Sequence, residues 1–240
     1  MSRNKTLKNM MIILFRSVRY NLKIVFSNKF IYFLIAAALF FLLVVLLSLF
    51  DPNVHPTKAT IYYWLLVPGL LVIFYPSVFG LQNDVDARII EVLFGIPNYR
   101  YKIWLVRLVL MFLIVAALLS LLALFSTISL VRFPIFQMVV QLMVPVGFFG
   151  AFAFFLSTAV KNGYGTAVLI IITALVFWVL SGSLAESKWN VFLNPFAEPQ
   201  NVSDLVWQDV ITKNRIYQLV AVAVFILTGL LNLQKREKFI

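Results

Sequence analysis

The sequence predicts an all-α membrane protein with six transmembrane helices, and three observations support this fold class. First, 62% of the 240 residues are hydrophobic and only 12% are charged, whereas soluble domains are about half apolar and a quarter charged. Second, six apolar runs approach or exceed the length of about 20 residues that a helix needs to cross a bilayer. Third, none of these runs contains Asp, Glu, Lys, Arg or His.

Polar or charged residues separate the apolar runs. Asp51 follows the first run, Arg107 and Arg132 flank the third, and Lys161 ends the fourth. The predicted spans cover residues 31–50, 61–80, 108–131, 135–160, 164–182 and 216–233. We therefore divide the chain into an N-terminal segment, residues 1–29, and a six-span domain, residues 30–240.

Residues 1–29 predict an amphipathic helix that lies in the membrane interface. Apolar residues recur at steps of four and three from Leu7 to Val25, and the basic residues fall mostly on other faces. The first apolar run starts only at residue 30, behind this long basic lead, so we expect a retained span and not a cleaved signal peptide. Two roles stay open for the helix: an anchor on anionic lipid, or a gate that also contacts a cytoplasmic partner.

The positive-inside rule predicts that both termini are cytoplasmic. This topology places 15 of the 20 basic residues and 4 of the 9 acidic residues inside, so the whole net charge of +11 lies on the cytoplasmic face. In a soluble chain that charge would indicate nucleic-acid binding. Here the topology explains this charge, and we expect membrane lipid, but no nucleic acid, as a partner.

The small size and the lack of an ATPase domain favour a bacterial inner (plasma) membrane.

The connection between the fifth and sixth spans, residues 183–215, is external in this topology and rich in apolar residues. It contains Trp189, Phe192, Phe196 and Trp207, which would not be left bare to water. We predict short re-entrant-like helices folded back onto the outer membrane surface. An interfacial aromatic belt and an external lid over a pathway are both open as interpretations.

The cytoplasmic segment of residues 81–107 is the most informative part of the sequence. Asp84 and Asp86 precede a short apolar helix, where a helix N-terminus favours negative charge, and Gly95 and Pro97 end it. An apolar helix at the cytosolic face needs a surface to bury against. That surface is either the bundle itself or a separate protein.

Catalytic motifs are missing from the sequence. The chain has no cysteine, which excludes thiol catalysis and thiolate metal sites, and it has no phosphate-binding loop, GxSxG elbow or HExxH pair. The single histidine, His55, is best interpreted as a solvated loop residue. Asp84, Asp86 and Glu91 are better explained by helix capping and salt bridges than by a paired-carboxylate site. We therefore expect no enzyme activity, no metal and no cofactor in this chain.

The absence of charge within the spans also limits how the chain could obtain energy for transport across the membrane. Ion-driven carriers and voltage sensors place ionisable residues inside the membrane. If this chain moves a substrate uphill, the energy enters from outside the lipid. Within the spans, Gly147 and Ala151 form a small-xxx-small pair, which predicts close helix packing within the bundle or at a subunit interface.

The cytoplasmic segment resembles that of the type-2 permeases of ABC transporters, the ABC-2 family. In that family an acidic stretch precedes a short helix with a Glu, then Pro-x-x-Arg, then a basic residue in the third span. Glu91, Pro97, Arg100 and Arg107 fit this order, although Arg88 and Ile89 stand where the family often has Gly-Thr. The topology, the amphipathic leader and the terminal Lys-Arg-Glu of residues 235–237 are similar as well.

This resemblance implies a coupling helix at residues 84–97 that docks into a cytoplasmic ATPase. It implies a transporter of two ABC ATPase subunits, which bind ATP and Mg, and two permease chains, identical or different. The residues to which it gives a role in ATPase coupling are Asp84, Asp86, Arg88, Glu91, Pro97, Arg100 and Arg107. The expected function is that of the permease subunit of an ATP-driven exporter, with an unknown substrate. The alternatives are a passive six-span channel and a non-transporting scaffold subunit.

Overall fold

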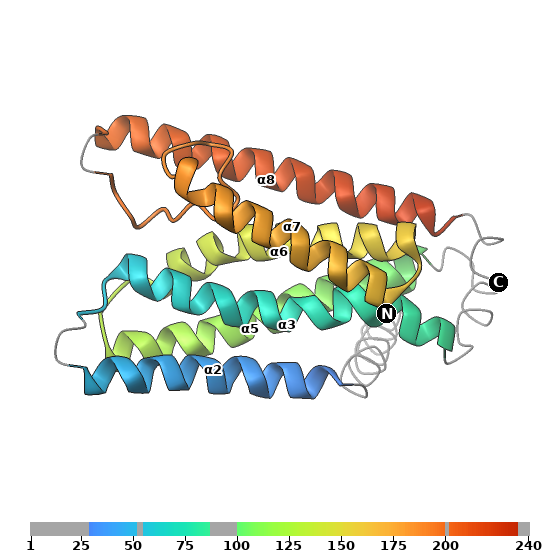
Figure 1. Ribbon diagram of the computed structural model, residues 1–240, viewed down its shortest axis with the longest axis horizontal. Coiled ribbons are helices and arrows are strands. Elements are labelled where there is room, and N and C mark those ends of the chain that lie inside the picture. Colours follow the sequence, from blue (N-terminus) through green and yellow to red (C-terminus); the bar gives the residue numbers. More distant parts are fainter. Residues whose placement is uncertain (1–28, 52–54, 87–99, 200–201, 235–240) are drawn as a thin grey trace, which may run out of the picture.

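The computed structural model describes residues 29–51, 55–86, 100–199 and 202–234 (Figure 1). Within these ranges every regular element is a helix, and six helices are long and apolar enough to cross a membrane. They are α2 (Phe30–Phe50), α3 (Lys58–Asp86), α5 (Val106–Ser129), α6 (Ile135–Val160), α7 (Gly163–Ser183) and α8 (Asp204–Asn232). A short π-helix, η1 (Arg100–Leu105), runs directly into α5. The predicted all-helical chain with six spans is confirmed.

The six helices run along the long axis of the molecule, and successive helices run in opposite directions (Figure 1). Because their number is even, α2 begins and α8 ends at the same end of the bundle. We call this end, with Phe30, Asp86 and Asn232, the terminal end. The opposite end, with Ser183 and Asp204, is the loop end.

Helices α3 and α6 form the centre of the bundle. They contact each other extensively, α2 and α5 cover α3, and α8 and α7 lie against α6 (Figure 1). Side chains such as Leu65, Val72, Leu119 and Leu142 are fully buried between them. Of the six spans, α7 is the least buried, so most of its surface faces outward.

A glycine on α6 allows the central helices to approach closely. A Cβ atom added at Gly150 would lie 2.6 Å from Cγ1 of Ile73 on α3 and 3.0 Å from Cε1 of Phe112 on α5. A Cβ added at Gly147, almost one turn earlier, meets nothing within 4 Å. Of these two glycines, only Gly150 lies where α6 approaches α3 and α5 closely.

We expect Gly150→Ala to destabilise the purified protein, because overpacking of a dense core typically costs about 1–3 kcal/mol. Gly147→Ala is the matched control. It should leave the stability unchanged or raise it, since alanine is favoured over glycine in a helix by up to about 1 kcal/mol. Thermal unfolding in detergent compares the two variants, and equal melting temperatures would contradict this view of the α3–α6 contact.

Four of the six helices lie within two residues of the predicted spans, and α6 has the predicted bounds. The second span was predicted too short: α3 continues to Asp86 and does not stop at residue 80, so Asp84 and Asp86 belong to the end of this helix and not to the connection after it.

The sixth span also differs, because α8 begins at Asp204 and not near residue 216. Its first three turns are amphipathic: Trp207 and Ile211 are buried at a spacing of four residues, whereas Asp209 and Lys213 are exposed. The polar face lowers the mean hydropathy, so a search for a continuous apolar run starts the helix too late.

The predicted helices between the fifth and sixth spans are wrong for residues 184–199, which form turns. Two asparagines set these turns, since the side-chain oxygens of Asn190 and Asn194 accept hydrogen bonds from the backbone N–H of Phe192 and Phe196, each at 3.0 Å. Asparagine side chains favour turns in this way because they compete with helical hydrogen bonds. Residues 190–194 are buried in the bundle, so this part of the segment does not lie on its outer surface.

The predicted amphipathic helix of residues 1–29 lies outside the described residues except for its last residue, Lys29. The predicted coupling helix lies outside them from residue 87 onward, as does the terminal basic cluster from residue 235.

Candidate functional site

The structure brings together two of the seven residues predicted to couple to an ATPase. Asp84, in the last turn of α3, and Arg107, in the first turn of α5, form an ion pair with 2.5 Å between Nη1 and Oδ2. Asp86 is exposed at the end of α3. Arg100 begins η1, of which the backbone is described. Arg88, Glu91 and Pro97 lie outside the described residues.

The Asp84–Arg107 pair is deeply buried. The two side chains are only 4–5% exposed, and the guanidinium carbon of Arg107 lies 5.1 Å from the ring centre of Trp104, in cation–π contact. Removing two charges from water is costly, and their attraction offsets that cost only when the geometry is good. Each charge therefore depends on the other, and the pair fixes the end of α3 to the start of α5.

Apolar side chains from five elements pack together beside the pair. Leu81 from α3, Trp104 from η1 and Leu108 from α5 form a cluster with Phe154 of α6 and Leu230 of α8. Leu233, just after α8, is fully buried in the same cluster. The junction of α3 and α5 is thus packed against the terminal ends of α6 and α8.

The π-helix η1 forms the entry into α5. Its six residues, RYKIWL, continue without interruption into Val106. π-Helical turns are rare, and they occur frequently at functional sites. Here the wide turn places Trp104 against Arg107, so the path of the chain into α5 and the position of the ion pair are connected.

A second contact ties the end of α3 to the start of α7. The side-chain oxygen of Gln82 accepts a hydrogen bond from the backbone N–H of Gly163 at 2.5 Å. A Cβ atom at Gly163 would lie 2.5 Å from that oxygen and 2.6 Å from Cδ1 of Phe79, so only glycine permits the approach. The α6–α7 turn is itself fixed by Asn162, whose side chain accepts from the N–H of Gly165 at 3.0 Å.

These contacts join the described helices at the terminal end. The Asp84–Arg107 pair links the end of α3 to the start of α5. Gln82 links α3 to α7, and the cluster around Trp104 includes residues of α6 and α8.

A second buried polar site, which the sequence patterns did not reveal, lies at the loop end. Arg215 of α8 is 7% exposed and donates from Nε to Oε1 of Gln141 on α6 at 2.7 Å. From Nη2 it donates to the carbonyl of Leu193 at 3.1 Å and to the hydroxyl of Tyr62 on α3 at 3.4 Å. Its Nη1 donates to Oδ1 of Asn214 at 2.9 Å. The ion pairs of the described residues do not include Arg215.

The neighbours of Arg215 hold the connection between α7 and α8 inside the bundle. Asn214 donates to the carbonyls of Lys188 and Asn190 at 2.9 and 2.8 Å, and Gln218 donates to that of Val191 at 3.2 Å. Phe192 stacks on Phe149 of α6 with 5.3 Å between the ring centres. We call residues 188–194 the inserted loop, in which residues 190–194 are buried and Trp189 stays exposed. The polar cluster fixes it between α3, α6 and α8.

One signal in the sequence could have indicated this site. Trp207, Ile211, Asn214, Arg215 and Gln218 recur at helical spacing on one face of α8, so the buried stripe continues from apolar into polar residues. The predicted topology places Arg215 in an external loop, which is wrong because this residue is buried within α8. A polar stripe in line with a buried apolar one indicates groups that are hydrogen-bonded inside the protein.

The described residues contain no group of three or more His, Cys, Asp or Glu side chains that could hold a metal ion. The buried charged side chains among them are Asp84, Arg107 and Arg215. All three are held by hydrogen bonds within the protein. The arrangement is suited to fixing helices and a loop in place.

No protein-family model matches the chain, and comparisons with curated proteins and with solved structures give no match either. The six apolar helices by themselves define the class: this is a multi-pass membrane protein.

Proposed function

We propose that this chain is the transmembrane permease subunit of an ATP-driven exporter of the ABC type, coupled to a separate cytoplasmic ATPase. The observation that carries the proposal is the buried Asp84–Arg107 pair at the base of residues 87–99. That segment bears the Glu91, Pro97 and Arg100 pattern that resembles the ABC-2 coupling helix. The pair joins the end of α3 to the start of α5, and the segment connects these two helices.

A firm link between α3 and α5 is what the transmission of force from an ATPase would need. A docked segment can move packed helices only if its two ends are held to them, because packed bundles shift between discrete arrangements and do not deform continuously. Asp84 and Arg107 supply this link to α3 and α5, and Gln82 extends it to α7. In this role the charged residues of the segment dock and position, and they are not catalytic.

The placement of buried charge supports an energy source outside the lipid. Asp84 and Arg107 lie at the terminal end, and Arg215 contacts Tyr62 and Gln141, which are near the loop ends of α3 and α6. Ion-driven carriers place ionisable groups along a pathway through the membrane. The described spans hold their buried charges close to the two ends.

In the proposed topology the terminal end faces the cytoplasm, both termini are cytoplasmic, and the membrane is a bacterial inner membrane. The complex contains two permease chains, identical or different, and two ATPase subunits that bind ATP and Mg. The inserted loop then closes the outer end of the bundle. The chain itself contributes no catalytic group.

Purification in mild detergent tests the proposal. The tagged chain, isolated from its native cells, should bring with it an ATP-hydrolysing subunit in a fixed ratio. Glu91→Arg should lower the recovered ATPase activity at least tenfold, because it reverses a charge in the docking segment. Glu186→Arg, the same change at an exposed residue of the loop end, is the matched control and should retain the activity.

Two outcomes would contradict the proposal. One is a clean oligomer with no nucleotide-binding subunit, in which case ion flux through vesicles would separate a passive channel from a scaffold. The other is full recovery of the ATPase with the Glu91→Arg variant.

A further inference from the structure

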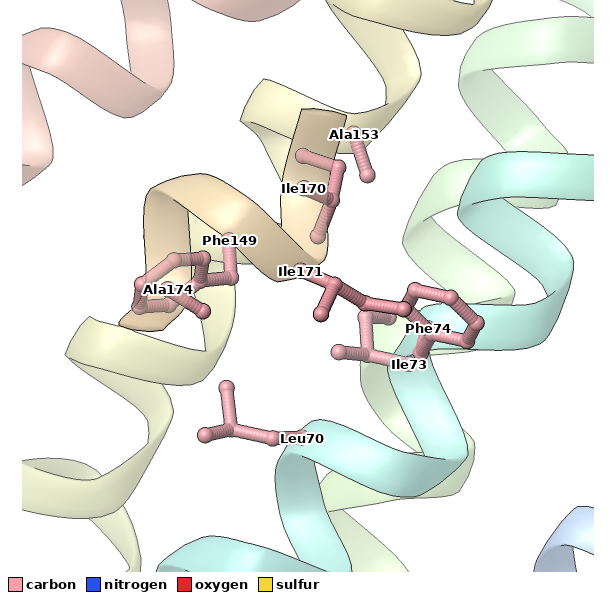
Figure 2. Close-up of a pocket in the computed structure, with 8 residues that line it drawn as sticks. All are labelled: Leu70, Ile73, Phe74, Phe149, Ala153, Ile170, Ile171 and Ala174. Carbon is pink, nitrogen blue, oxygen red and sulfur yellow. The ribbon is translucent and has the colours of Figure 1, made fainter. Parts of the chain in front are cut away.

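An apolar cavity of about 100 Å³ lies between α3, α6 and α7. Figure 2 shows eight side chains around it, all hydrocarbon. Its walls are Leu70, Ile73 and Phe74 from α3, Phe149 and Ala153 from α6, and Ile170, Ile171 and Ala174 from α7. A cavity without polar partners does not hold water, and engineered apolar cavities of about 150 Å³ stay dry and bind apolar molecules.

The cavity lies at the middle of three membrane spans. The wall residues of α3 are 12 to 16 positions after Lys58 in a helix of 29 residues, and those of α7 are 7 to 11 positions after Gly163 in a helix of 21. At about 1.5 Å per residue, both sets lie near the midpoint of their helices. This depth corresponds to the centre of the bilayer, where the surrounding medium is lipid hydrocarbon.

The cavity borders the outward-facing surface of α7. Ile171 belongs to its wall and is 49% exposed, whereas Ile73 and Phe149 on the inner walls are 1% and 4% exposed. Ala153 and Ala174 are short side chains where larger ones would fill the space. The wall thus runs from the exposed side of α7 to the buried faces of α3 and α6.

We propose that this cavity binds one hydrocarbon tail of a bilayer lipid. A tail at this depth passes from hydrocarbon to hydrocarbon, so the hydrophobic effect contributes little. The favourable free energy of binding comes from new dispersion contacts, because side chains around an empty space lack partners for such contacts. A flexible chain of methylenes fits a narrow space between three helices better than a polar or bulky group does. The site does not depend on the proposed transport function.

Photolabelling in nanodiscs tests the site. The full chain is placed in phosphatidylcholine nanodiscs that contain a phosphatidylcholine with a diazirine at the middle of one acyl chain. After illumination, labelled residues are located by mass spectrometry. Label on Ile73 and Phe149 is diagnostic, because only a tail inside the cavity reaches these buried side chains.

Ala174→Leu should fill the cavity and lower labelling of Ile73 and Phe149 at least fivefold. Ala174→Val, a smaller change, should lower it to an intermediate level and guards against misfolding of the larger variant. Ala223→Leu on the exposed face of α8 is the matched control and should leave labelling within twofold of the parent protein.

The proposal is overturned if Ile73 and Phe149 carry no more label than buried residues away from the cavity, such as Leu65. That result is also expected if a second protein chain covers the cavity. It is equally overturned if folded Ala174→Leu protein is labelled there as strongly as the parent. Because labelling needs no ATPase, neither result bears on the proposed transport function.

Discussion

Asp84→Ala is expected to lower the free energy of unfolding by about 3–5 kcal/mol, the typical cost of breaking a buried ion pair from one side. The substitution removes the carboxylate that neutralises Arg107 at 2.5 Å, in a site where both side chains are nearly inaccessible to water. The protein then has to bury a guanidinium without that carboxylate, or open the junction of α3 and α5. Thermal unfolding of the purified protein in detergent measures the loss.

Two further variants separate the ion pair from other effects. Asp86→Ala removes the same group one half-turn later, at an exposed position, and should change stability by no more than about 0.5 kcal/mol. Asp84→Ala combined with Arg107→Met should recover much of the loss, because a buried pair is often replaceable by apolar side chains. If the single variant is as stable as the Asp86→Ala control, the junction is not held by this pair.

Arg215→Ala is expected to release the inserted loop from the bundle. The change removes four hydrogen bonds, including those to the carbonyl of Leu193 and the side chain of Gln141. A buried polar group that loses its partner costs about 1–3 kcal/mol, so we expect a total of about 3 kcal/mol or more. At about 1.4 kcal/mol per factor of ten, hydrogen exchange of residues 188–194 should become roughly 100-fold faster.

Lys213→Ala is the control for this prediction. Lys213 lies two residues from Arg215 and pairs with Asp209 at 2.6 Å, but both side chains are at least half exposed, and such surface pairs contribute little. Exchange of the inserted loop should stay as in the parent protein. Slow exchange that persists in Arg215→Ala would show that the apolar contacts of Phe192 hold the loop without the polar cluster.

The spans could be predicted because each one is a continuous apolar run, and α6 has the bounds that the sequence indicated. The start of α8 could not, since its first turns bury only Trp207 and Ile211 and expose charges on the other face. The inserted loop was missed for a related reason. Its aromatic residues indicated burial, but the hydrogen bonds from Arg215 and Asn214 that hold it in the bundle join residues more than 20 positions apart in the chain.

In the candidate site, too, the sequence indicated individual residues but not the contacts between residues far apart in the chain. The resemblance to the ABC-2 coupling segment singled out both Asp84 and Arg107, each as a residue for ATPase coupling. That they form one buried pair follows from the packing of α3 against α5 and from the π-helical turn before Arg107, which no local pattern specifies. Gln82 was not singled out, because its partner is a backbone N–H 81 residues away.

Site-specific photo-crosslinking tests most directly whether the segment between α3 and α5 docks on an ATPase. Benzoylphenylalanine replaces Phe94 within that segment, or Trp189, an exposed aromatic residue at the loop end, in the native cells. We predict an adduct from position 94 with a subunit that azido-ATP also labels, and no such adduct from position 189. Absence of an ATP-binding adduct at position 94, or equal adducts at both positions, would contradict the proposed coupling.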